Sequence, residues 1–215
     1  MFLSIALKQL ILHCSYATLK DYASKLLVAS SVPLLLRIII SDLEEATYVG
    51  GVARPDIIEY LLELIYCSRE GLTSNELIEL IRMDQQRQEA SGCQEPRPYL
   101  EQSSWVQLIY SPQQLLAPRK GLYNFTHDYV RQAVEAVYFG NRSRFDELKT
   151  AEAKEKRRKV HRWLAIFFEM KSAVDNVTLT SMDEYPRSMR ELTYHQRMAE
   201  LRPSVIVAAW VRPRS

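Results

Sequence analysis

Glycine is scarce in this chain: only 6 of its 215 residues are glycine, and 9 are proline. Sandwiches and barrels of β-strands need many tight turns, which glycine usually supplies, so the scarcity favours helices. Apolar residues account for 47% of the chain and charged residues for 25%, which is close to the average of globular proteins and speaks against disorder. We therefore expect a mainly α fold with a core of its own.

The charges nearly balance, because 28 Lys and Arg residues stand against 26 Asp and Glu residues and leave a formal net charge of +2. Overall charge therefore does not draw this chain to polyanions. Three cysteines are an odd and sparse set, which is typical of a reducing compartment rather than of a disulfide framework. We expect a cytoplasmic protein without a membrane segment, because the apolar run of residues 26–40 is short and is broken by Pro33 and Arg37.

Residues 1–50 are predicted to form a helical segment. A single helical stripe, which we expect to face a core, is formed by Leu3, Leu7, Leu10 and Cys14. Two further helical stretches meet at Pro33, which suits the first turn of the second helix, with Ser30 or Ser31 as its N-cap. The pair Gly50-Gly51 ends this segment.

Residues 55–140 begin with two predicted helices. Asp56 is the expected cap of the first, and Thr73 with Glu76 has the form of a capping box for the second. Gly71 stands where a left-handed cap would end the first helix. The apolar positions that share a face on these helices are Ile58, Leu61, Leu62 and Ile65, followed by Leu77, Ile78 and Ile81.

A short third helix, a hairpin and a fourth helix are expected next. Ser104 is the expected cap of the third helix, residues 115–125 form a hairpin with Gly121 in its turn, and Thr126 caps the fourth helix. The apolar residues of these two helices are Trp105, Leu108 and Ile109, followed by Val130, Val134 and Val137. Three helices, a hairpin and a helix in this order make a winged-helix unit, in which the hairpin is the wing.

The remainder, residues 141–200, is expected to be a helical linker. A long helix is predicted from Arg144 to Met170, and residues 171–199 are expected to hold one or two short helices. Its buried stripe is Val160, Trp163, Leu164 and Phe167. We expect part of the face with Trp163, Phe167 and Phe168 to lack a partner, so that the chain self-associates or depends on another protein. Residues 201–215 are expected to be an irregular tail.

Five stretches carry a family resemblance: SSVPLLLR at 30–37, LIYCSREGLTSNEL at 64–77, GLYNFTHD at 121–128, HRWLA at 161–165 and ELTYH at 191–195. They are similar to the elements "NPLxLR", "SRxGLxxxEL", the stretch with an "HD" sensor, "HxxLA" and "ELPYH". In this order they resemble the region after the nucleotide-binding core of STAND signalling ATPases. The resemblance covers residues 18–199. It is closest to NACHT proteins with tetratricopeptide repeats, of the nephrocystin and tetratricopeptide-repeat-protein type.

The resemblance implies a helical lid segment followed by a winged-helix unit with a small β-hairpin wing and a C-terminal helical linker toward a repeat region. It also implies two nucleotide-sensor positions. In the family the proline of the lid element packs on the adenine, and Pro33 is the matching residue. The histidine of the "HD" pair reaches the diphosphate and locks the resting state, and His127 is the matching residue.

The chain departs from the family in one respect that matters for chemistry. It contains no G-x-x-x-x-G-K-[ST] sequence, and therefore neither the backbone cradle nor the lysine that would hold phosphates. We expect no cofactor here, and ATP or ADP only in a full-length parent. The departure also favours a segment or a shortened product of a larger protein, and no enzyme.

Each candidate residue has a plainer interpretation. Pro33 opens a helix whatever else it does, and for this chain alone we favour His127 as a first-turn residue whose ring packs on the wing. Residues 154–159 are rich in Lys and Arg, yet nearby glutamates favour a solvated helix face over a nucleic-acid patch. No metal site is expected, because the four histidines are scattered, at His13, His127, His161 and His195.

Two functions remain. The first is a non-catalytic regulatory and protein-interaction segment of a STAND-type signalling or scaffold protein, which couples a nucleotide core to a repeat array by rigid-body motion. The alternative is a winged-helix nucleic-acid-binding module that places residues 104–110 in the major groove. That segment has no Lys or Arg, and the wing tip offers only Arg119 and Lys120, so we rank nucleic-acid binding second.

Overall fold

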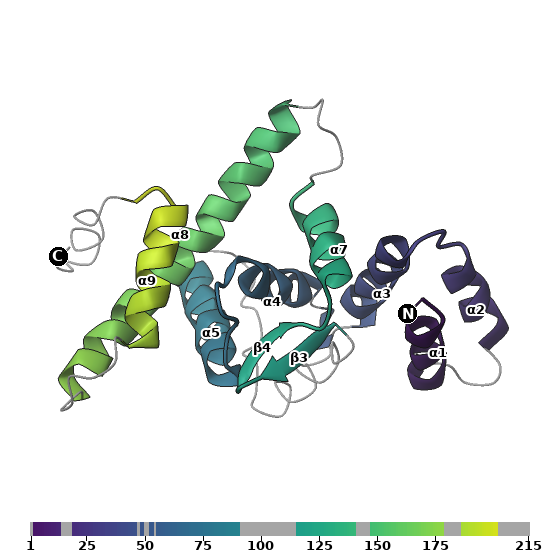
Figure 1. Ribbon diagram of the computed structural model, residues 1–215, viewed down its shortest axis with the longest axis horizontal. Coiled ribbons are helices and arrows are strands. Elements are labelled where there is room, and N and C mark those ends of the chain that lie inside the picture. The colour runs from purple at the N-terminus through teal and green to yellow at the C-terminus, as the bar shows by residue number, and fades with distance from the viewer. Residues whose placement is uncertain are drawn as a thin grey trace. The chain divides into compact units, whose positions relative to one another are not determined.

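The computed structural model describes residues 2–13, 19–46, 48–49, 52–53, 55–90, 115–140, 147–178 and 186–201. The described residues are mainly helical, with two small antiparallel hairpins, so the predicted mainly α fold with a small hairpin is confirmed (Figure 1). The chain divides into two compact units. The first unit comprises Met1–Tyr66 and Leu72–Tyr138, and the second comprises Cys67–Gly71 and Phe139–Ser215.

The N-terminal segment of the first unit contains α1 (Phe2–His13), α2 (Leu19–Leu27) and α3 (Val32–Ala46). Helix α3 begins as the sequence predicts: the Ser31 carbonyl accepts from the Leu35 N–H at 3.0 Å, and Ser31 Oγ accepts from the Leu34 N–H at 3.4 Å. Pro33 lies in its first turn, where its missing N–H leaves no bond unmade. The buried face of α3 consists of Leu35, Leu36, Ile39, Ile40 and Leu43.

The expected core-facing stripe of α1 is wrong in part. Leu3 is 70% exposed and Leu7 is 56% exposed, whereas Ala6 is buried. Helix α1 contacts α2 and α3, and a small side chain such as alanine lets helices approach closely. The sequence of α1 is apolar on nearly every side, so periodicity alone could not identify which face the neighbouring helices would cover.

A two-stranded hairpin that the sequence analysis does not anticipate follows α3. It consists of β1 (Tyr48–Val49) and β2 (Val52–Ala53), with Val49 opposite Val52. The dipeptide between the strands in the sequence is Gly50-Gly51, which is a recognised signal for a two-residue hairpin connection. The signal was present, but we took it only as the end of a helical segment.

Helices α4 (Pro55–Cys67) and α5 (Ser74–Ala90) follow, and the predicted capping box at the start of α5 is confirmed. The Thr73 N–H donates to Glu76 Oε2 at 2.9 Å, and the Glu76 N–H donates to Thr73 Oγ1 at 3.1 Å. Helix α4 begins at Pro55, so Asp56 lies inside its first turn rather than before it. Gly71 has the expected positive φ, 98°.

The predicted hairpin is also confirmed, as β3 (Leu116–Arg119) and β4 (Leu122–Phe125). Its two connecting residues both have positive φ, 53° at Lys120 and 79° at Gly121, as a type I′ turn requires. Leu72, which lies just before the capping box, pairs with Tyr123 through two backbone hydrogen bonds of 3.3 and 2.7 Å. The hairpin is thereby tied to the start of α5. The third helix expected over residues 104–110 lies outside the described residues.

Helix α7 (Asp128–Tyr138) closes the first unit by packing on α3. Val130 and Val134 are buried as expected, and Val137 is half-buried. Tyr138 Oη donates to Glu44 Oε1 of α3 at 2.6 Å. Burial raises the pKa of the Glu44 carboxyl, and the hydrogen bond from Tyr138 opposes this; burial and that same bond raise the pKa of Tyr138.

The second unit is dominated by two helices that pack side by side, α8 (Glu147–Thr178) and α9 (Arg187–Met198) (Figure 1). Helix α8 continues past the predicted end at Met170. Phe167 and Phe168 are buried, so the expectation that their face lacks a partner is wrong for these two residues. That expectation assumed that only the repeats would cover this face of α8, and it did not consider α9, which packs on α8. The tail of residues 202–215 lies outside the described residues.

Helix α9 ends in a Schellman motif without glycine. The Leu201 N–H donates to the Gln196 carbonyl at 2.9 Å, and the Glu200 N–H donates to the Arg197 carbonyl at 3.1 Å. Glu200 has a φ of 55°, a region that non-glycine residues rarely adopt. Its carboxylate pairs with Arg158 of α8, so the residue that ends α9 also contacts its partner helix.

We predict that Gly121→Ala lowers the free energy of unfolding of the first unit by about 1 kcal/mol, because an L side chain is strained at that φ. A Cβ atom there would meet no other atom within 4 Å, so the cost is conformational and not a clash. Lys120→Asn should instead raise the free energy of unfolding, since asparagine tolerates a left-handed conformation. Urea denaturation followed by circular dichroism measures both. A neutral Gly121→Ala together with a destabilising Lys120→Asn would contradict the type I′ assignment.

Candidate functional site

The two site residues that the sequence predicts both lie at the start of a helix, Pro33 in α3 and His127 at α7. Pro33 is the second residue of α3 and is half-buried. His127 directly precedes α7 and is exposed. Helices α3 and α7 pack on each other, so the structure brings the two helices together in the first unit. Each of the two residues therefore has a structural role at the start of its helix, and this role requires no bound ligand.

His127 has a defined local geometry. Its Nδ1 accepts the Tyr129 N–H at 3.2 Å, and its carbonyl accepts the Val130 N–H at 3.0 Å, so it occupies the cap position of α7. Its ring stacks on Tyr129, with centroids 4.9 Å apart and planes 5° apart. Thr126, the expected cap, instead donates from its hydroxyl to the Leu115 carbonyl at 3.3 Å. With Nδ1 engaged, the nitrogen of His127 left for other contacts is Nε2.

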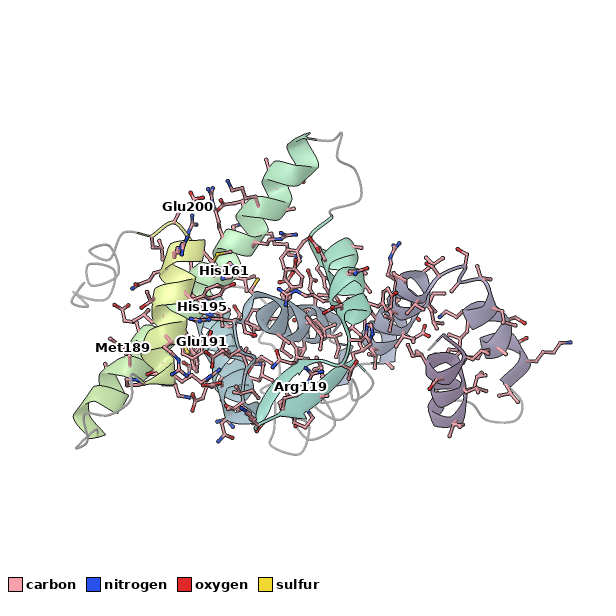
Figure 2. All side chains as sticks on the ribbon, viewed as in Figure 1. Arg119, His161, Met189, Glu191, His195 and Glu200 are labelled. Atoms are coloured by element: carbon pink, nitrogen blue, oxygen red, sulfur yellow. The ribbon has the colours of Figure 1, made fainter. Side chains whose placement is uncertain are left out.

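Among the described residues of the second unit, His161 from α8 and Glu191 and His195 from α9 form a buried cluster of ionisable side chains (Figure 2). We call these three residues the histidine cluster. The Nδ1 atoms of the two histidines are 2.9 Å apart, within hydrogen-bond distance. His195 Nε2 lies 3.3 Å from Glu191 Oε2, at ion-pair distance but without hydrogen-bond alignment. Exposure is 4% for His161 and 0% for Glu191 and His195.

Helix geometry explains how these residues meet. Glu191 and His195 are four residues apart and therefore lie on one face of α9. His161 lies on the apolar side of α8, next to the buried Val160 and one turn from the buried Leu164. The packing of α8 on α9 then brings together side chains that are 34 residues apart in the chain.

Further contacts tie the cluster to its surroundings. The Arg69 N–H donates to Glu191 Oε2 at 3.4 Å, and Arg187 donates to the Gly71 carbonyl, so α9 is also bound to the segment Cys67–Gly71. Phe168 stacks on His195 with planes 8° apart. Tyr194 presents its ring to both imidazoles at centroid distances of 5.8 and 5.1 Å. The cluster is therefore enclosed by rings as well as by helices.

Burial makes both histidines poor bases. It lowers the pKa of His161 to about 4, and the neighbouring His195 and Arg157 act in the same direction. Burial also lowers the pKa of His195, with Arg187 adding to the effect and Glu191 opposing it. Both imidazoles are consequently neutral at pH 7. A neutral pair can hold two helices together through one hydrogen bond, and its burial keeps substrates away.

The contact between the two histidines is not evident from the sequence. His161 lies in the HRWLA stretch and His195 in the ELTYH stretch, and the four histidines of the chain are scattered along it. The available signal was Glu191 four residues before His195, the spacing that puts an acid and an imidazole on one helix face. Among the described residues no group of three or more His, Cys, Asp or Glu side chains is arranged to hold a metal ion.

No family model, no curated protein and no solved structure matches this chain. Within the described ranges, no helix is both long enough and apolar enough to cross a bilayer.

We predict that Glu191→Ala lowers the free energy of unfolding of the second unit by about 1–3 kcal/mol. The substitution removes the acceptor of the Arg69 N–H and the carboxylate that faces His195 Nε2, and buried polar groups that lose a partner are costly. Glu200→Ala is the matched control, because it removes an exposed carboxylate in a surface ion pair with Arg158 and should change stability little. Equal effects of the two variants in thermal denaturation would contradict a structural role for the cluster.

Proposed function

We propose that this chain is a non-catalytic regulatory and protein-interaction segment of a STAND-type signalling or scaffold protein in the cytoplasm. The observation that carries the proposal is the exposed apolar stripe of α1, formed by Leu3, Leu7 and Ile11. These side chains are spaced at i, i+4 and i+8 and are exposed by 70%, 56% and 80%. A stripe of large aliphatic side chains in water is typical of a surface that another protein covers.

The histidine cluster supports a non-catalytic role. Its histidines and glutamate are residue types of acid–base chemistry, but the three side chains are buried rather than open to solvent. General acid–base groups must reach a substrate proton directly or through one water. Enclosed as it is, the cluster suits the joining of helices better than catalysis.

The resemblance to STAND proteins is supported by where its pieces lie. The stretch that resembles "SRxGLxxxEL" forms the end of α4 and the start of α5, with a complete capping box. The pieces that resemble "HxxLA" and "ELPYH" supply His161 and His195, which contact each other. The stretches HRWLA and ELTYH, which are separate in sequence, thus take part in one local structure.

The second candidate, a nucleic-acid-binding module, rests on the wing. Arg119 and Lys120 are exposed at the tip of the β3–β4 hairpin, where a wing can contact phosphates. The helix that would read bases, residues 104–110, lies outside the described residues and carries no Lys or Arg in its sequence. Two basic residues give few phosphate contacts, so this function ranks second.

The stripe of α1 generates a prediction about association. We expect the chain to self-associate in a concentration-dependent manner, and Leu7→Lys to shift it toward monomer, because a charge in the stripe must be desolvated on contact. Ser4→Lys is the matched control, since Ser4 is exposed on the same helix but outside the stripe. Sedimentation velocity over a wide concentration range measures the shift. A wild-type chain that stays monomeric throughout, or an equal effect of the two lysines, would contradict the prediction.

A second prediction concerns nucleotides. We expect no ATP hydrolysis and no binding of ATP or ADP at low micromolar affinity, because a helix-opening proline and one exposed histidine cannot replace a phosphate-binding loop. Isothermal titration calorimetry with Mg²⁺ present measures this. Low micromolar binding that disappears in His127→Ala but persists in Tyr129→Ala would show instead that His127 contacts the nucleotide.

A further inference from the structure

The contact between His161 and His195 depends on a single proton. Their Nδ1 atoms are 2.9 Å apart, and a hydrogen bond at this distance needs one nitrogen that carries a proton and one that does not. Two neutral imidazoles satisfy this requirement when they adopt complementary tautomers. Two fully protonated rings cannot, because both facing nitrogens would then be donors.

The charge of Glu191 favours one direction for this hydrogen bond. Its carboxylate faces His195 Nε2 at 3.3 Å and favours a proton on that nitrogen. His195 Nδ1 is then the acceptor, and His161 Nδ1 carries the shared proton. The neutral arrangement therefore runs from the Glu191 carboxylate through the His195 ring to His161.

Other charges around the pair come from each element packed against it. Arg157 of α8 and Arg187 of α9 both oppose an added positive charge, and Glu191 favours one.

In the segment Cys67–Gly71, Glu70 is 3.6 Å from Arg190 of α9 in an ion pair of its own, and Arg69 reaches Glu191 through its backbone N–H. The ring of Tyr194 on α9 contacts both imidazoles edge-on. The two arginines outweigh the single carboxylate of Glu191, so the surroundings of the two histidines disfavour a further positive charge on either ring.

We propose that the histidine cluster is an acid-sensitive latch: the neutral pair holds α9 against α8 and the segment Cys67–Gly71, and protonation of the imidazoles below neutral pH releases α9. The proposal goes beyond the proposed function and does not rest on it. Release would free the contacts that α9 makes through Glu191 and Arg187. It would also expose Phe168, which is fully buried and stacked on His195.

The sign of the pH dependence follows from the lowered pKa values. A histidine whose pKa is lowered in the folded state binds its proton more readily once α9 has opened, where its pKa is about 6.5. The latch is therefore at full strength above about pH 6.5 and weakens as the pH falls toward about 4, where His161 becomes protonated in the closed state as well.

Hydrogen–deuterium exchange of the full chain, read by mass spectrometry, tests the latch locally. After correction for intrinsic exchange rates, the protection of α9 should fall by about tenfold or more between pH 7.5 and 5.5, the effect of one such histidine. The peptide that covers α4, in the first unit, serves as the internal reference and should change much less.

Two variants separate the latch from a general effect of acid. His161→Asn keeps an N–H donor near the position of Nδ1 but cannot be protonated, so α9 should remain protected and lose the part of its pH dependence that His161 contributes, while the part from His195 remains. His127→Asn makes the same substitution at an exposed histidine outside the second unit, and the pH dependence of α9 should stay as in the wild type.

Nitrogen-15 NMR of histidine-labelled wild-type chain keeps the proposal testable if His161→Asn does not fold. At pH 7.5 we expect His161 as the Nδ1–H tautomer and His195 as the Nε2–H tautomer. The proposal is overturned if either ring is already protonated at pH 6.5, if both rings have the same tautomer, or if α9 in His161→Asn loses protection with acid as the wild type does.

Discussion

A buried hydrogen bond joins two imidazole rings of the second unit, and it needs a proton on one of the facing Nδ1 atoms and none on the other. The rings face each other from α8 and α9 at 2.9 Å, inside a shell that includes Phe168 and Tyr194. A polar contact this deep stabilises only while every partner is satisfied, and the same low polarity that strengthens it makes a missing partner costly. The histidine cluster therefore joins α8 to α9 by a contact whose strength depends on where its protons lie.

The first unit is organised differently, by short-range signals that act on neighbouring residues. Ser31 caps α3, Thr73 and Glu76 cap each other at α5, and Lys120 with Gly121 turns the hairpin. Each of these devices is complete within four residues and satisfies backbone groups that would otherwise face water or the core. Aliphatic side chains then supply the burial that joins the helices, with Tyr138 and Glu44 as a half-buried polar contact between α3 and α7.

This difference explains how much the sequence could predict. The capping box at Thr73 and the hairpin near Gly121 were predictable because the required residue types are adjacent in the chain. The exposed side of α1 was not, since its apolar residues surround the helix and the neighbouring helices decide which of them is covered. The cap of α7 was misassigned because both Thr126 and His127 can accept a backbone N–H, and the hairpin engaged the threonine. The histidine cluster needed a pairing across 34 residues, which no local pattern contains.

The bridge between Leu72 and Tyr123 has a consequence for how the first unit can vary in evolution. Two backbone hydrogen bonds tie the hairpin to the residue just before α5. Each of them is donated by the backbone N–H of residue 72 or 123, so a proline at either position would remove a bridge donor and weaken the attachment of the hairpin. Other substitutions keep both donors whatever side chain they bring. Natural variants should accordingly differ freely in residue type at these two positions but lack proline at both.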